Sequence, residues 1–214
     1  MKKMLAMLIS AVFALVSLSG CQMNTNKVSQ LTEDELAYFN GNSFFTNEYE
    51  SSLVTVNIRN QFLSSLYDKP ENIDLLELFY SGTGTIEDIS EEEINAAMSA
   101  QGIEGSAEAL PTGYHKTSRA SMDKVLTDHM GISLEDSAKI GLEKFVFLPE
   151  YDAYYHLHGD TNYRMQIHFT KGEQIGDLIK LYYDDDFYGD GEKVLTLKKK
   201  DGGYLFISNQ KIGK

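Results

Sequence analysis

The sequence predicts an α+β fold, in which N-terminal helices pack on a C-terminal antiparallel sheet of about five strands. Before Phe145, apolar residues recur every three or four positions, which is typical of helices. From Phe145 onward they alternate with polar residues, which is typical of strands. Because the helices precede the strands and do not alternate with them, the sheet is expected to bury one face against the helices.

Capping patterns mark the predicted helices. Thr32 with Glu35, and Ser90 with Glu93, have the Ser/Thr-x-x-Glu spacing of a capping box at a helix N-terminus. The remaining predicted helices cover residues 52–66, 70–82, 121–131 and 133–142. Residues 102–117 carry little apolar pattern and are interpreted as a long loop.

Five strands are predicted, at residues 151–158, 163–170, 176–184, 193–199 and 204–208. In the second of them Met165, Ile167 and Phe169 alternate with polar residues, which gives one apolar face. Turn pairs such as Gly159-Asp160 and Lys171-Gly172 separate the strands and favour an antiparallel meander. A curved sheet of the cystatin or NTF2 type fits this pattern.

The N-terminus has the features of an export signal. Lys2 and Lys3 precede an uncharged apolar run that is too short to span a bilayer comfortably. The run ends in Leu18-Ser19-Gly20-Cys21, which resembles the lipobox of bacterial lipoproteins at all four positions. The resemblance implies that residues 1–20 are removed and that Cys21 is diacylated. Two acyl chains give stable anchoring, so we expect a membrane-anchored protein on the extracytoplasmic face of the cell membrane.

Three other stretches look like a group of uncharacterised bacterial lipoproteins. They are residues 59–68 (RNQFLSSLYD), 74–80 (DLLELFY) and 151–163 (YDAYYHLHGDTNY). This resemblance implies no activity.

The mature chain divides into a tether and one domain. Residues 21–30 contain the lipidated cysteine and a polar tether, whose nine residues after Cys21 span at most roughly 30 Å when extended. Residues 31–214 form a single domain, mainly helical over 31–144 and mainly β over 145–214. Cys21 is the only cysteine, so the domain has no disulfide, and its 42% hydrophobic residues must supply a packed core.

The mature chain is strongly acidic. Without residues 1–20 it has 17 Lys and Arg against 32 Asp and Glu, a formal net charge of −15. Such a surface repels nucleic acid, which is excluded as a partner. A basic protein face, a cationic peptide or a divalent cation is compatible with it.

Residues 151–162 are the densest polar and aromatic run. The candidate ligand-binding residues are Tyr151, Tyr154, Tyr155, His156, His158 and Asp160. His156 and His158 share one face of their strand, as metal-binding pairs can, but a third ligand is required. In the predicted hairpin His168 falls on the other face, which leaves Asp160. We therefore predict no metal and no other cofactor.

Two further motifs fit their chemistry only in part. The acidic stretch from Asp184 to Glu192 has oxygen donors suited to calcium, but Tyr188 and Leu197 occupy ligand positions of an EF-hand alignment. The sequence does not decide whether this stretch binds calcium.

Ser121 and Lys124 have the S-x-x-K spacing of penicillin-binding proteins without its partner motifs, so no catalytic residue is predicted.

These observations favour a non-enzymatic, lipid-anchored domain that binds a protein, a peptide or a cell-wall component. One alternative is a regulator or inhibitor of cell-wall enzymes, in which the acidic surface engages a basic partner. A second alternative is an envelope hydrolase that uses His156, His158 and Asp160.

Overall fold

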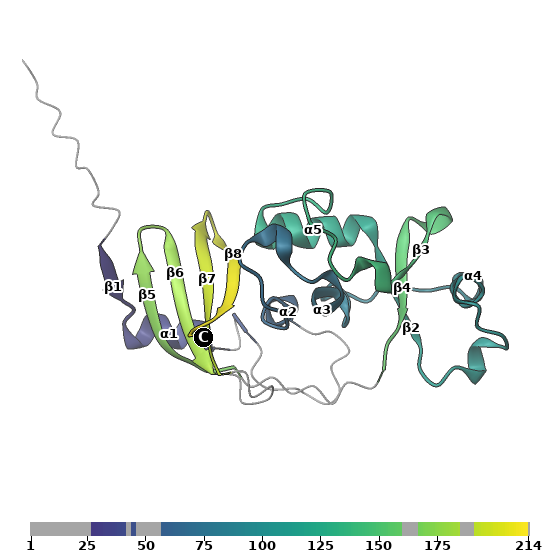
Figure 1. Ribbon diagram of the computed structural model, residues 1–214, viewed down its shortest axis with the longest axis horizontal. Helices are drawn as coiled ribbons and strands as arrows, with labels where there is room; N and C mark the ends of the chain where they lie inside the picture. Colours follow the sequence, from purple (N-terminus) through teal and green to yellow (C-terminus); the bar gives the residue numbers. More distant parts are fainter. Residues whose placement is uncertain (1–26, 42–43, 46–56, 160–166, 185–190, 214) are drawn as a thin grey trace, which may run out of the picture.

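The computed structural model describes residues 27–41, 44–45, 57–159, 167–184 and 191–213. Its described part is an α+β structure with a five-stranded sheet, a three-stranded sheet and five α-helices, which confirms the predicted fold class. The five-stranded sheet, a layer of helices, the three-stranded sheet and then α4 follow one another along the long axis (Figure 1). Within the described residues, no helix combines the length and apolar character needed to cross a membrane.

The five-stranded sheet is antiparallel, in the order β1-β5-β6-β7-β8. Its strands are β1 (Val28–Gln30), β5 (Phe169–Ile175), β6 (Leu178–Asp184), β7 (Glu192–Lys200) and β8 (Gly203–Lys211). Residues 28–30, placed in the tether by the sequence, pair with residues 173–175 as strand β1. The predicted turn at Lys171-Gly172 is wrong, because both residues lie inside β5.

The three-stranded sheet has the order β2-β4-β3 and is also antiparallel. Its strands are β2 (Tyr114–Ser118), β3 (Val146–Leu148) and β4 (Ala153–Leu157). The predicted hairpin between residues 151–158 and 163–170 is therefore wrong, since β4 pairs with β2 and β3. The predicted loop at residues 102–117 is wrong at its end, where β2 begins.

The α-helices are α1 (Glu33–Asn40), α2 (Ile58–Gln61), α3 (Leu75–Phe79), α4 (Glu91–Gln101) and α5 (Arg119–Met130). Short 3₁₀ helices span Pro70–Asn72, Ala107–Ala109, Leu142–Lys144 and Pro149–Tyr151.

Both predicted capping boxes are confirmed, at the starts of α1 and α4. α2 is much shorter than the predicted helix, of which residues 52–56 lie outside the described residues. α5 begins two residues before Ser121, because Ser118 is its N-cap. Ser133 and Asp136 cap a turn and not a helix.

Two hydrophobic clusters join helices to sheets. The larger joins α2, α3 and α5 to one face of the five-stranded sheet, where the rings of Phe62 and Phe206 stack with centroids 4.3 Å apart. The smaller joins α4 to the three-stranded sheet through residues such as Met98, Tyr114 and Tyr155. The other face of the three-stranded sheet is turned toward the helical layer, and the histidines lie there.

Candidate functional site: a histidine cluster beside the β2 edge

Three histidines meet on one face of the three-stranded sheet. His115 of β2 lies directly opposite His156 of β4, and His158 follows two residues later on the same face. The ring centroids of His115 and His158 are 4.1 Å apart with nearly parallel planes, and those of His115 and His156 are 5.7 Å apart. The shared face predicted for His156 and His158 is confirmed. Sequence reasoning missed His115, because residues 114–118 (YHKTS) carry no apolar alternation that would mark a strand.

Tyr80, the residue after α3, covers the histidines. The Nε2 atom of His156 lies 2.8 Å from the Tyr80 carbonyl oxygen, and the Gly159 N–H donates to Tyr80 Oη at 3.0 Å. Because a carbonyl oxygen only accepts, His156 Nε2 carries the proton and Nδ1 is the unprotonated nitrogen. That Nδ1 atom is buried and has no hydrogen-bond partner among the described residues.

The surroundings of the cluster favour neutral imidazoles. Burial is the largest influence on His156, whose side chain is 4% exposed, and the Tyr80 carbonyl only partly opposes it. Together with the neighbouring His115 and His158, burial lowers the pKa of His156 to about 4. Burial and His158 also lower the pKa of His115. Both rings are therefore uncharged at neutral pH.

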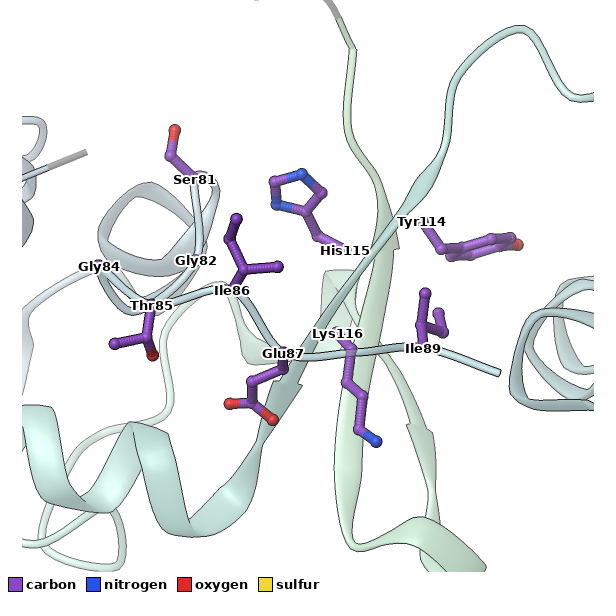
Figure 2. Close-up of a pocket in the computed structure, with 10 residues that line it drawn as sticks. All are labelled: Ser81, Gly82, Gly84, Thr85, Ile86, Glu87, Ile89, Tyr114, His115 and Lys116. Carbon is purple, nitrogen blue, oxygen red and sulfur yellow. The ribbon is translucent and has the colours of Figure 1, made fainter. Parts of the chain in front are cut away.

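A cavity of about 190 Å³ lies between β2 and the segment that follows Tyr80. It is lined by Ser81, Gly82, Gly84, Thr85, Ile86, Glu87, Ile89, Tyr114, His115 and Lys116. Figure 2 shows His115 and Ile86 extending to one side of the strand, and Glu87 and Lys116 to the other. The histidine cluster therefore contributes one wall of the cavity through His115.

The outer edge of β2 carries peptide groups that β4 does not use. The His158 N–H donates to the Gly113 carbonyl and the Arg119 N–H to the Asp152 carbonyl, so the odd-numbered residues of β2 bond toward β4. The peptide groups of Tyr114, Lys116 and Ser118 consequently point outward. The Ser118 N–H donates to the Glu87 carboxylate at 3.1 Å, whereas none of the described residues hydrogen-bonds the outward groups of Tyr114 and Lys116.

The opposite face of the sheet holds a buried polar network centred on Glu93 of α4. Its carboxylate accepts from Tyr155 Oη at 2.6 Å and from the Ser90 N–H at 2.8 Å, and lies 2.5 Å from Lys116 Nζ. Burial raises the pKa of Glu93, but the bonds from Lys116, Ser90 and Tyr155 outweigh it and hold this pKa at about 2. The network joins α4 to β2 and β4, which is a structural role.

The candidate ligand-binding residues do not all lie on one face of the three-stranded sheet. Tyr154, His156 and His158 share the face of the histidine cluster, whereas Tyr155 is fully buried on the other face. Tyr154 packs on Phe147 with ring centroids 4.8 Å apart, and the Tyr151 side chain is 37% exposed. Asp160 lies outside the described residues.

The other motifs do not assemble sites in the described part of the chain. There, no group of three or more His, Cys, Asp or Glu side chains is arranged to hold a metal ion. Lys124 pairs with Asp128, while Ser121 Oγ bonds Ser118 Oγ, so nothing joins Ser121 to Lys124 as S-x-x-K chemistry requires. The acidic stretch lies mostly outside the described residues, which include only its ends, Asp184, Gly191 and Glu192.

No family model matches this chain, and neither the curated proteins nor the solved structures contain a match to it.

Proposed function

We propose that this chain is a lipoprotein, anchored through acylated Cys21 to the extracytoplasmic face of the cell membrane, whose domain binds an extended peptide. The peptide comes from an envelope protein or from the cell wall. The lipobox at residues 18–21 supports the anchor. The observation that carries the binding role is the outer edge of β2, where no described residue hydrogen-bonds the peptide groups of Tyr114 and Lys116, beside an open cavity.

The chemistry of this edge suits a peptide backbone. An extended peptide offers N–H and C=O groups at the two-residue spacing of Tyr114 and Lys116, and strand addition of this kind is a common mode of peptide recognition. The neighbouring cavity has room for one side chain of the peptide, with Ile86 and Ile89 as apolar walls. Backbone bonds would supply affinity and the cavity would supply selectivity.

The negative charge of the cavity wall and of the domain favours one class of peptide. Lys116 is neutralised by Glu93, which leaves Glu87 as a carboxylate in the cavity wall. The mature domain is also acidic overall. A peptide with a basic residue beside its apolar side chain is therefore the favoured ligand.

The anchor is tested by mass spectrometry of the protein extracted from its native membranes. We expect a mature chain that begins at Cys21 and carries diacylglycerol, and a Cys21→Ser variant that is absent from the membrane fraction. A free thiol in the mature native protein would contradict the anchor.

The binding role is tested with an array of immobilised pentapeptides at pH 7. An Ile86→Asp variant alters a cavity residue that is 65% exposed, so folding is expected to survive. Ile212→Asp is the matched control, because Ile212 is 40% exposed and does not line the cavity. We expect Ile86→Asp, and not Ile212→Asp, to weaken bound peptides at least about tenfold, equivalent to 1.4 kcal/mol. No binding by the native protein, or equal loss in both variants, would refute the role.

A further inference from the structure

We infer that the histidine cluster makes the wall of this cavity acid-sensitive: protonation of His115 and His156 separates Tyr80, and the segment that follows it, from β4. As a statement about ligand binding, this inference rests on the proposed function. As a statement about the cavity wall, it is tested without a ligand.

Tyr80 attaches the cavity wall to the end of β4. The wall begins at Ser81, directly after Tyr80, and Tyr80 is held to the end of β4 by its contacts with His156 and Gly159. Its ring also packs on those of His156 and His158, with centroids 5.2 and 4.8 Å away. Loss of these contacts would free the start of the wall.

Protonation would place positive charge where the described surroundings do not balance it. The described titratable groups facing the cluster are His115 from β2, His156 from β4, His158 just after β4, and Tyr80 after α3. The Phe145 ring packs on His156 and is uncharged. No carboxylate of the described residues forms an ion pair with His115 or His156. Glu87, the carboxylate in the cavity wall, accepts from the Ser118 N–H and extends away from His115, to the other side of β2 (Figure 2).

Proton linkage gives the direction and size of the effect. The pKa of His156 is about 4 in the closed structure, against 6.5 for an exposed histidine, so the open state binds more protons between these values. Acid therefore favours opening. From pH 7 to pH 5, His156 alone is expected to raise the open population about twentyfold.

Amide hydrogen exchange on the purified protein, without ligand, tests this expectation. The amides to follow are Gly159, which donates to Tyr80 Oη, and Gly82, which donates to the Phe79 carbonyl beside Tyr80. Their protection, corrected for intrinsic exchange at each pH, is expected to fall about twentyfold from pH 7 to pH 5. The amides of Tyr67 and Asn209, which bond each other's carbonyls beside the five-stranded sheet, should keep their protection.

A non-titrating variant separates the cluster from other acid effects. His156→Gln keeps an N–H donor for the Tyr80 carbonyl and should lose most of the pH dependence. His129→Gln is the matched control, since His129 is another histidine whose pKa burial lowers, but it lies on α5 against Phe62. This control should keep the native response. If His156→Gln does not fold, His115→Gln serves instead and should weaken the response.

Three results would overturn the inference: constant protection of the Gly82 and Gly159 amides between pH 7 and pH 5, equal loss at Tyr67 and Asn209, or a native response in both His156→Gln and His115→Gln. None of them bears on peptide binding at pH 7. A failure of the acid response is therefore distinguishable from a failure of the proposed function.

Discussion

Glu93 serves two parts of the molecule at once. Its side chain closes the capping box of α4 with Ser90, and it is also the common partner of Lys116 and Tyr155. The sequence predicted the cap, because capping depends on a local spacing of three residues. It did not predict the bond to Tyr155, 62 positions away, because that contact exists only after β2 and β4 pair.

Replacing Glu93 by Gln is expected to destabilise the fold by about 3 kcal/mol, because Lys116 would lose its counter-ion in a largely buried position. The measurement is the free energy of unfolding in urea at pH 7. Glu91→Gln, an exposed change in the first turn of the same helix, should change it by less than about 0.5 kcal/mol. Equal losses in the two variants would show that negative charge in the first turn of α4, and not the ion pair with Lys116, is what matters.

The same carboxylate should make stability depend on acid. The pKa of Glu93 is about 2 in the folded chain, below its unfolded value of 4.5, so the unfolded state binds more protons between them. The contribution of Glu93 is present above pH 4.5 and is lost as the pH falls toward 2. Urea midpoints measured between pH 5 and pH 2.5 should fall less steeply in Glu93→Gln than in Glu91→Gln. Identical slopes would contradict the low pKa.

At the scale of elements, Gly172 explains why the turn predicted at Lys171-Gly172 was misplaced. A Lys-Gly pair is typical of a turn, but here Gly172 lies within β5 because the Leu31 side chain packs against its backbone. A Cβ at this position would come within 2.4 Å of Leu31 Cδ1. Sequence patterns predicted β6, β7 and β8 to within a few residues, because alternation marks these strands and the predicted turn at residues 201–203 includes the residues between β7 and β8.

Gly172→Ala is accordingly expected to destabilise the protein by about 2 kcal/mol, since Leu31 must move to admit the methyl group. Gly203→Ala is the control, because Gly203 also lies in a strand and its Cβ would meet no atom within 4 Å. The readout is the urea midpoint. Adding Leu31→Ala to Gly172→Ala should cost less than the two single changes together. Strict additivity would mean that the two side chains do not compete for space.

At the scale of the whole molecule, the chain follows the predicted order of helices and then strands, with β2 as the main interruption. The fold class was predictable because apolar periodicity is a local signal. The division into two sheets was not, because β2 and β4 are joined across 34 intervening positions or more and the sequence carries no local mark of that pairing. The histidine cluster depends on this pairing, so only His156 and His158 were predicted and His115 was missed.

The predicted single domain should unfold as one unit, since the helical layer lies between the two sheets. Phe62→Ala, which removes the ring stacked on Phe206, is expected to cost about 4 kcal/mol. Amide signals of Thr117 in β2 and Leu197 in β7 should follow the same urea transition, before and after this change. If only the Leu197 transition moves, the two sheets are separate folding units.

β1 has a mechanical consequence if Cys21 is held in a membrane. This strand has three residues and pairs with β5 at the margin of the sheet, so tension on the anchor reaches the fold first through a very short ladder. Separating β1 from β5 would lengthen the tether by about 10 Å, at up to 3.6 Å per residue. The other four strands would keep their mutual pairing. A weak force on the anchor would therefore separate β1 and extend the chain before it distorted the cavity.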